Sequence, residues 1–377
     1  MNRPAVSVVM VTCNVERFLS EAIESIVGQT FADFEFIIVD FGSSDNSHAI
    51  AARYAAIDNR IKLHKISHCN VPEARNAGCL LAQGRYIAVM DADDVSLRNR
   101  LELQVNFMER HPEIGLLGGW AEWMDEHANP LWVNKPPTEG DEIKAVLPIR
   151  STFCHPSMLI RTDAFFRVGG YRRIFAQAND YDLALRISEQ FPCANLARVI
   201  LRYRVHVHQI SLMKRRGQTL SKLAAQASAL ARKAGQTDPL NPVSEITGAV
   251  VTRLGISKAK QQVHFTSDYL FWMKTLWKAG QIRMALRGTM EILRFDRRHS
   301  VRLRLSRINL GGAKFYWQRG RLCAACIGAL SATMIDPAMA RCLVLALVRR
   351  LERRSPFKAM NDGPLAYRFR TKSKDAK

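Results

Sequence analysis

Short apolar runs alternate with amphipathic segments through the first ninety residues of the chain. Runs rich in β-branched residues are typical of buried parallel strands, and apolar residues at helical spacing between them indicate amphipathic helices. We predict strands at residues 5–11, 34–39, 61–65 and 86–90, and helices at 16–27, around 50–54 and at 72–81. This alternation predicts an α/β fold with a mostly parallel central sheet.

Polar residues follow the ends of three of these predicted strands. Thr12 and Asn14 follow the first strand, Asp40 ends the second, and Asp91 and Asp93 follow the fourth. Ligands bind at the carboxyl ends of the strands in open α/β sheets, so we expect these side chains to meet at one rim.

The segment 91–94 places three acidic residues within four positions. Carboxylates that crowd together repel one another and lose solvation, so they are tolerated mainly where a cation or ligand hydroxyls offset their charge. The alternative is a solvated acidic turn before a helix that begins near Arg98. The polar residues after the other strands favour a ligand site.

A series of short motifs follows this pattern along the chain. They are VTCN at 11–14, QTFADFE at 29–35, IVDFGSSD at 38–45, ARNAG at 74–78, GRYI at 84–87, DADD at 91–94, HPS at 155–157, VGGY at 168–171, NDYDLALR at 179–186 and YRVH at 203–206. This ordered set, spanning roughly residues 5–211, resembles the inverting family-two glycosyltransferases. The resemblance implies a GT-A fold that binds a nucleotide sugar.

The resemblance also implies roles for the residues at the rim. Asp93 would hold Mn²⁺ or Mg²⁺, which are hard ions that prefer oxygen ligands, and Asp91 would contact the ribose or assist. Asp40 and Arg75 would bind the nucleoside, with a uridine nucleotide as the default donor. The alternative for Arg75 is a plain surface arginine on a helix.

Asp180 matches the catalytic base of the family's acidic pair. An ordinary aspartate is ionised at neutral pH and can accept a proton from the acceptor hydroxyl, and a positioned base contributes roughly 10²–10⁴ in rate. Asp180 also precedes the apolar residues of a predicted helix, so capping that helix is an alternative or additional role. Asn179 stands where the family pair usually has glutamate.

Two histidines and one phenylalanine complete the candidate site. His206 follows a predicted strand at 199–205 and would be a second metal ligand or touch the diphosphate, although a histidine at a strand end is often incidental. His155 would shape the acceptor side or have a structural role. Cys13 replaces an aromatic residue of the family pattern, so we hypothesise that Phe41 supplies the stacking face for the base.

The charge of the chain divides sharply near residue 211. Residues 1–211 contain 22 lysines and arginines and 25 acidic residues, a net charge of −3. Since the whole chain carries +21, the residues after 211 carry +24. We therefore predict a GT-A domain at 1–215, a basic helical domain at 216–356 and a basic disordered tail at 357–377. The helical domain contains a weak repeat of tryptophan, glycine and alanine, at 277, 280 and 285 and again at 317, 320 and 325, which indicates two tetratricopeptide-like αα-hairpins.

The basic part of the chain restricts its partners. Nucleic acid, an anionic membrane and an anionic acceptor would all suit the charge, but no nucleic-acid-binding motif is present. Residues 341–354 form a basic amphipathic pattern that can lie in a membrane interface, and no run is long enough to span a bilayer. With eight scattered cysteines and no signal peptide, we expect a cytoplasmic protein with reduced thiols, attached peripherally to the inner face of the membrane.

These observations predict a metal-dependent inverting glycosyltransferase of surface polysaccharide biosynthesis. It would move a sugar from a nucleotide donor to a saccharide or lipid-linked saccharide. Two alternatives are direct transfer to polyprenyl phosphate, which usually accompanies transmembrane helices, and a basic scaffold that binds nucleotides without catalysis. The presence of Asp40, Asp93 and Asp180 favours the enzyme.

Overall fold

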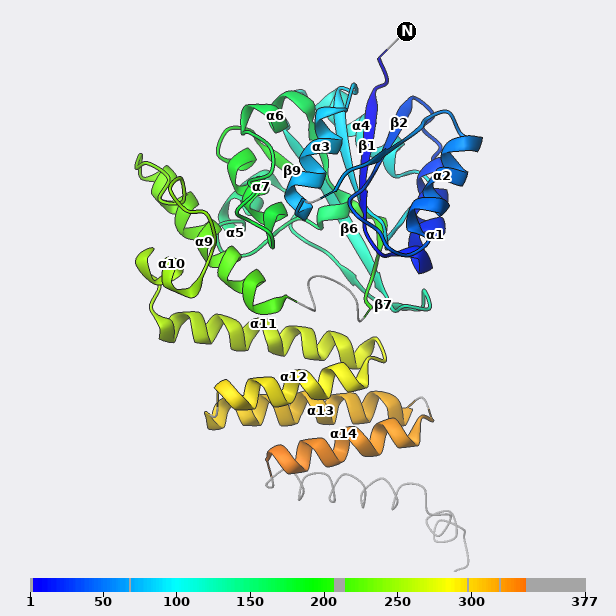
Figure 1. Cartoon of the computed structure of the whole chain (residues 1–377). Helices are drawn as coiled ribbons and strands as arrows, with labels where there is room; N and C mark the ends of the chain where they lie inside the picture. Colours follow the sequence, from blue (N-terminus) through cyan, green and yellow to red (C-terminus); the bar gives the residue numbers. More distant parts are fainter. Residues whose placement is uncertain (1–2, 68, 207–213, 297, 319, 337–377) are drawn as a thin grey trace, which may run out of the picture. The chain divides into compact units, whose positions relative to one another are not determined.

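The computed structural model describes residues 3–67, 69–206, 214–296, 298–318 and 320–336 (Figure 1). Contacts divide the chain into two compact units, Met1–Asp296 and Arg297–Lys377, and each is described by itself. The predicted amphipathic segment at 341–354 and the tail at 357–377 lie outside the described residues.

In the described part of the first unit, nine strands form one sheet in the order β3-β2-β1-β4-β8-β6-β9-β5, with β7 paired to β6. The strands are β1 (Val6–Thr12), β2 (Phe34–Asp40), β3 (Ile61–Lys65), β4 (Tyr86–Asp91), β5 (Val95–Ser96), β6 (Leu116–Met124), β7 (Pro130–Asn134), β8 (Leu159–Arg161) and β9 (Cys193–Arg204).

Strands β1 to β4 pair in parallel, β8 inserts antiparallel between β4 and β6, and β9 runs parallel to β6. The strands β1, β2, β3, β4, β6 and β9 therefore run in one direction, and β5, β7 and β8 run in the other. The predicted α/β class with a mostly parallel sheet and a helical C-terminal region is confirmed.

Helices cover both faces of the sheet. They are α1 (Glu16–Val27), α2 (Ser47–Ile57), α3 (Val71–Leu80), α4 (Arg100–Arg110), α5 (Gly140–Val146), the 3-10 turn η1 (His155–Ser157), α6 (Thr162–Arg167) and α7 (Asn179–Ser188). Alternate residues of a strand point to opposite faces, so Val8 of β1 packs in a cluster with α1, α2 and α4, whereas Val9 packs in a second cluster with α3, α6 and α7.

The start of α3 shows how the sequence sets the position of a helix. The side chain of Asn70 accepts a hydrogen bond from the amide of Glu73 at 3.1 Å, and the Glu73 carboxylate accepts one from the Asn70 amide at 2.9 Å. This capping box fixes the first turn of the helix. Gly78 lets the same helix approach β1, because a Cβ there would lie 2.6 Å from a methyl group of Val9.

Helices α9 (Arg215–Lys233), α10 (Gly248–Arg253), α11 (Lys258–Lys278) and α12 (Ile282–Phe295) complete the first unit. Leu223 of α9 and Val251 of α10 are buried in the same cluster as Leu183 of α7. The hydrophobic core therefore continues past the change of charge near residue 211. A separate domain at 216–356 stays a prediction.

The glycines of the predicted repeat lie between helices. Gly280, with φ of 81°, joins α11 to α12, and Gly320, with φ of 72°, follows α13 (His299–Gln318) and precedes α14 (Leu322–Ile335) in the second unit. Glycine adopts this left-handed conformation without steric cost, so each residue allows a tight reversal of the chain. Among the described residues, no helix has the length and apolar character needed to cross a membrane.

Candidate active site

The acidic segment after β4 is held by the end of β9. A carboxylate oxygen of Asp94 accepts a hydrogen bond from the backbone amide of Arg204 at 2.7 Å, and the Asp93 carbonyl accepts one from Arg204 Nε at 2.9 Å. Burial, together with repulsion from Asp93 and Asp91, raises the pKa of Asp94 well above its ordinary value. Asp94 therefore braces the loop, while Asp91 and Asp93 lie at its edge.

Asp93 and His206 form a close pair at this edge. A carboxylate oxygen of Asp93 lies 2.8 Å from Nε2 of His206, whose ring packs 4.8 Å from the ring of Phe18. Nδ1 of His206 is buried and has no hydrogen-bond partner among the described residues. The structure thus brings together the two residues that the sequence suggested as metal ligands.

The described residues contain no group of three or more histidine, cysteine or acidic side chains arranged to hold a metal ion. Asp93 and His206 offer one carboxylate and one imidazole. Mg²⁺ usually keeps several waters and is bound by one or two carboxylates together with substrate phosphates, so a complete protein cage is not required. The pair fits an ion whose coordination is completed by a diphosphate.

Arg75 connects the acidic segment to the start of α7. Its guanidinium donates to Asp91 at 2.8 Å and to the side-chain oxygen of Asn179 at 2.5 Å. With only 14% of its side chain exposed, Arg75 is not a plain surface arginine. Burial would raise the pKa of Asp91, but the charge of Arg75 and the contact with His155 outweigh it and hold this pKa well below the ordinary value.

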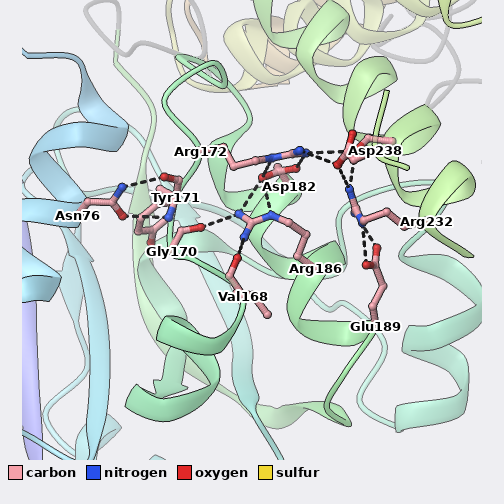
Figure 2. A network of polar contacts seen from close by, with 11 residues as sticks. Asn76, Val168, Gly170, Tyr171, Arg172, Asp182, Arg186, Glu189, Arg232 and Asp238 are labelled. Carbon is pink, nitrogen blue, oxygen red and sulfur yellow. Dashed lines mark hydrogen bonds and ion pairs between the residues drawn. The ribbon is translucent and has the colours of Figure 1, made fainter. Parts of the chain in front are cut away.

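His155 supports this connection from inside the protein. Its Nε2 lies 2.9 Å from the hydroxyl of Tyr171, its Nδ1 lies 3.6 Å from Asp91, and only 7% of its side chain is exposed. The side-chain amide of Asn76, next to Arg75 on α3, donates to the backbone carbonyl of Tyr171 at 2.7 Å and accepts from its backbone amide at 2.9 Å (Figure 2). His155 and Tyr171 therefore help to position Asp91 and Arg75.

The residues at the carboxyl ends of β1 and β2, and in the loops that follow, hold one another in place. Thr12 and Asp40 are register partners, and the Asp40 carboxylate is buried, with the amide of Ser43 and Nδ1 of His48 each at 2.9 Å. The side-chain oxygen of Asn14 accepts from the amide of Ser44 at 2.8 Å. The carboxylate of Asp40 and the amide oxygen of Asn14 are thus engaged within the rim, and their direct contact with a nucleoside stays a prediction.

Phe41 is half-buried at the same rim. Its ring packs against a cluster formed by Ile37, Val39 and Ala74. Its backbone amide donates to the carbonyl of Thr12 at 3.1 Å, which ties the loop after β2 to the end of β1. The stacking role suggested by the sequence stays a prediction.

Asp180 lies in the first turn of α7. Ala178, with φ of 53° and ψ of 29°, is the N-cap residue, so Asp180 is not the cap. Burial raises the pKa of Tyr171, and the charges of Asp180 and Asp91 raise it further. Burial alone would lower the pKa of Arg75, but the charges of Asp91 and Asp180 are among those that raise it. Asp180 also lines a pocket with residues of α9 and α11.

Asp182, two residues further along, belongs to an ion-pair network (Figure 2). Its carboxylate pairs with Arg172 and, at 2.8 Å, with Arg186. Arg172 reaches Asp238 at 2.7 Å, and Arg232 of α9 pairs with Asp238 at 2.6 Å and with Glu189 at 2.7 Å. The network ties α7 to α9.

Four residues of the site had no role predicted from the sequence: Tyr171, Arg204, Arg172 and His48. Tyr171 and Arg204 lie within the quoted motifs, so their positions carried a signal. Arg172 pairs with Asp182 and Asp238, and His48 contacts Asp40, and no local sequence pattern indicates such pairs.

Two proteins of known structure align with most of the chain. The crystal structure of residues 1–349 of Staphylococcus aureus TarS has a TM-score of 0.48 and 14% identity, covering 87% of this chain and 91% of that one. The mannosyltransferase PcManGT from Pyrobaculum calidifontis, in complex with GDP-Man and Mn²⁺, has a TM-score of 0.49 and 15% identity, covering 89% of this chain and 87% of that one.

Sequence comparison gives closer matches. An uncharacterized glycosyltransferase of Methanocaldococcus jannaschii, MJ1057, is 36% identical over 210 residues, which cover 54% of this chain and 72% of that protein. The O-antigen biosynthesis glycosyltransferase WbnJ of Escherichia coli is 31% identical over 205 residues, covering 53% and 80%. The sequence model described as Glycosyl transferase family 2 matches residues 7–170, which include Asp40, Arg75, Asp91 and Asp93. With these relatives matched over most of their length, the chain belongs to glycosyl transferase family 2 and is a glycosyltransferase.

Proposed function

We propose that the protein is a metal-dependent, inverting glycosyltransferase that uses a nucleotide-sugar donor. The observation that carries the proposal is the position of Arg75, which contacts Asp91 at the end of β4 and Asn179 at the start of α7. This arrangement ties the acidic loop to the residue that precedes Asp180. A donor site and a base are thereby held on one structural support.

The donor half of the site consists of the acidic segment and the loops after β1 and β2. Asp93 and His206 would hold Mn²⁺ or Mg²⁺, which would neutralise charge on the departing nucleoside diphosphate. Arg75 keeps Asp91 ionised and oriented for a ribose hydroxyl. Asp40 holds the loop after β2 through Ser43, and this loop would border the nucleoside.

Asp180 is the proposed base. Inversion by a single displacement requires the acceptor hydroxyl to lose its proton on the face opposite the leaving group. As the hydroxyl oxygen forms the new bond to the anomeric carbon, its proton passes to the Asp180 carboxylate and the bond to the diphosphate breaks. The rigid start of α7, fixed by the ion pairs of Asp182, would hold this carboxylate in place.

The biological setting is proposed from the relatives. The match with WbnJ, and a 29% identical match over 245 residues with the amylovoran biosynthesis glycosyltransferase AmsE of Erwinia amylovora, support a role in polysaccharide biosynthesis. We propose a saccharide or a lipid-linked saccharide as the acceptor. The net charge of +24 after residue 211 supports peripheral attachment to an anionic membrane.

The test combines turnover with binding. Release of the nucleoside diphosphate is measured with UDP- and GDP-sugars as donors, Mn²⁺, and a panel of methyl glycosides as acceptors. The anomeric configuration of the product is determined by NMR. Asp180→Asn should lower kcat by roughly 10²–10⁴ and leave nucleotide affinity unchanged. Asp141→Asn, on the exposed surface of α5, is the matched control and should behave as wild type.

Three results would contradict the proposal. A product that retains the anomeric configuration of the donor would exclude the single displacement. Nucleotide binding without turnover in wild type across the panel, and with polyprenyl phosphate as acceptor, would identify a non-catalytic scaffold. Turnover only with polyprenyl phosphate would identify direct transfer to that carrier.

A further inference from the structure

A pocket of about 260 Å³ lies beside Asp180 and is bordered by helices outside the region that the family model matches. One wall is the start of α7, with Asp180 and Tyr181. The opposite wall comes from α9 and α11, and includes Gln218, Asp268 and Trp272. The proposed base therefore faces a space that residues after 214 help to form.

We propose that this pocket binds an uncharged sugar ring of the acceptor, with Trp272 as its stacking face and Asp268 as a partner for its hydroxyls. The inference rests on the proposed function and adds to it the place where the acceptor binds and the neutral charge of the bound ring. The acceptor site would then be built by the helical segment, while the donor site is built by the sheet.

The aromatic wall suits the apolar face of a sugar. Trp272 is partly exposed, and its neighbour Phe271 has 53% of its surface exposed, although both are large aromatic residues of one helix. Binding sites for small molecules combine such aromatic surface with a few polar groups that fix orientation. The volume of the pocket lies just below the roughly 300–1,000 Å³ of drug-sized sites, which suits a single ring.

The charges of the lining balance one another. Asp180 and Asp268 are acidic, and Arg215 and Lys222 are basic. The Asp268 carboxylate accepts from the Thr219 hydroxyl at 2.8 Å and lies 3.7 Å from the Lys222 ammonium. A diphosphate would require a surplus of positive charge, whereas a balanced set of carboxylate, amide and hydroxyl groups suits the hydroxyls of a neutral sugar.

Both walls are anchored to the catalytic part of the chain. Trp272 lies 5.7 Å from Trp123 of β6, which stacks at 4.8 Å on Trp132 of β7, and Lys278 lies 4.8 Å above the Trp132 ring. The ion pairs of Arg232 tie α9 to α7 on the other side (Figure 2). The pocket is therefore held in shape without a ligand.

The experiment measures binding by calorimetry, with the full chain in the presence of UDP and Mn²⁺. The probes are neutral methyl glycosides of glucose, galactose, mannose and N-acetylglucosamine, with methyl glucuronide and inorganic pyrophosphate as charged probes. At least one neutral glycoside should bind to the wild type. Trp272→Ala and Asp268→Asn should each weaken the affinity for that glycoside at least about tenfold. Trp272→Phe should retain most of the affinity. Val263→Ala, an exposed change on α11 outside the pocket, is the matched control.

The outcomes separate this inference from the proposed function. If Asp180→Asn loses turnover but still binds the glycoside, both stand. If wild type transfers sugar to a neutral glycoside and Trp272→Ala leaves the KM for that glycoside unchanged, only the pocket inference is overturned. Binding of the charged probes alone, lost in Trp272→Ala, would overturn the neutral class. Neutral-glycoside binding without any turnover would overturn the proposed function and leave the pocket.

Discussion

The side-chain oxygen of Asn179 accepts a hydrogen bond from Arg75 at 2.5 Å, across 104 positions of sequence. The same arginine donates to Asp91, so one guanidinium joins the end of β4 to the first residue of α7. Arginine presents several donors in a rigid fork, and this geometry allows it to hold two partners at once.

Arg75→Lys is therefore expected to be damaging although it keeps the charge. A lysine ammonium is a single point charge on a flexible stem and cannot hold both partners in the same geometry. We expect kcat/KM to fall at least about tenfold, equivalent to roughly 1.4 kcal/mol of transition-state stabilisation. Steady-state kinetics checks this, with Arg53→Lys on the exposed face of α2 as the control. Equal loss in both variants would contradict the special role of Arg75.

Asp238 gives a prediction about acid stability. Burial alone would raise its pKa, but hydrogen bonds from Ser228 and the Leu240 amide, with the charges of Arg172 and Arg232, lower it to about 2. The ionised carboxylate thus favours the folded state, and this contribution is present above the unfolded pKa of about 3.9 and is lost as the pH falls toward 2.

Asp238→Asn should consequently destabilise the protein at neutral pH by roughly 1–2 kcal/mol. Urea denaturation of both proteins at several pH values measures the difference. The difference should be constant above pH of about 5 and shrink between pH values of about 4 and 2. A difference that persists unchanged at the acidic limit would show that Asp238 acts through packing rather than charge.

Ala178 gives a prediction that links backbone conformation to activity. Its φ of 53° lies in the left-handed region, which costs a residue with a side chain roughly 1–2 kcal/mol. Ala178→Gly should leave activity intact, whereas the β-branched Ala178→Val should destabilise the fold and displace the start of α7 with Asp180. The expected result is a lower kcat in the valine variant, measured beside its thermal unfolding.

Ala128→Val is the matched control for this pair. Ala128 has φ of 63° in the turn between β6 and β7, so it carries the same conformational penalty away from α7. The control should lose stability and keep its kcat. If both valine variants lose activity in proportion to stability, the conformation of Ala178 has no specific role in the site.

Metal dependence can be tested without turnover. Mn²⁺ with UDP should raise the unfolding temperature of wild type, because a ligand that binds the folded state stabilises it by mass action. Asp93→Asn should lose this increase, His206→Ala should reduce it, and EDTA should abolish it in wild type. Glu142→Gln on the exposed surface of α5 serves as the control. An undiminished increase in Asp93→Asn would remove that residue from the metal site.

Whether an element could be predicted from the sequence depends on how far apart in the chain its stabilising partners lie. The strands from Val6 to Asp91 could be predicted because buried parallel strands read as continuous apolar runs. The insertion of β8 between β4 and β6 could not, because it depends on the pairing of Leu159 with Ala88 and Leu117, which both lie far earlier in the sequence.

The site shows the same division. The acidic residues of the rim followed from their positions after strands, and Asp93 does lie beside His206. The partners that orient them, such as Asn179 for Arg75 and Tyr171 for His155, are set by tertiary packing. Whether Phe41 stacks on a base depends on a ligand and stays a prediction.

The clamp between Arg204 and the acidic segment has a consequence for protein synthesis. Asp94 accepts its hydrogen bond from a backbone amide 110 positions further along the chain. During translation the acidic segment leaves the ribosome before that amide does, and domains generally fold as units. A nascent chain that ends before Arg204 therefore lacks the amide that holds Asp94, so the acidic segment can reach its final arrangement only after β9 has been synthesised.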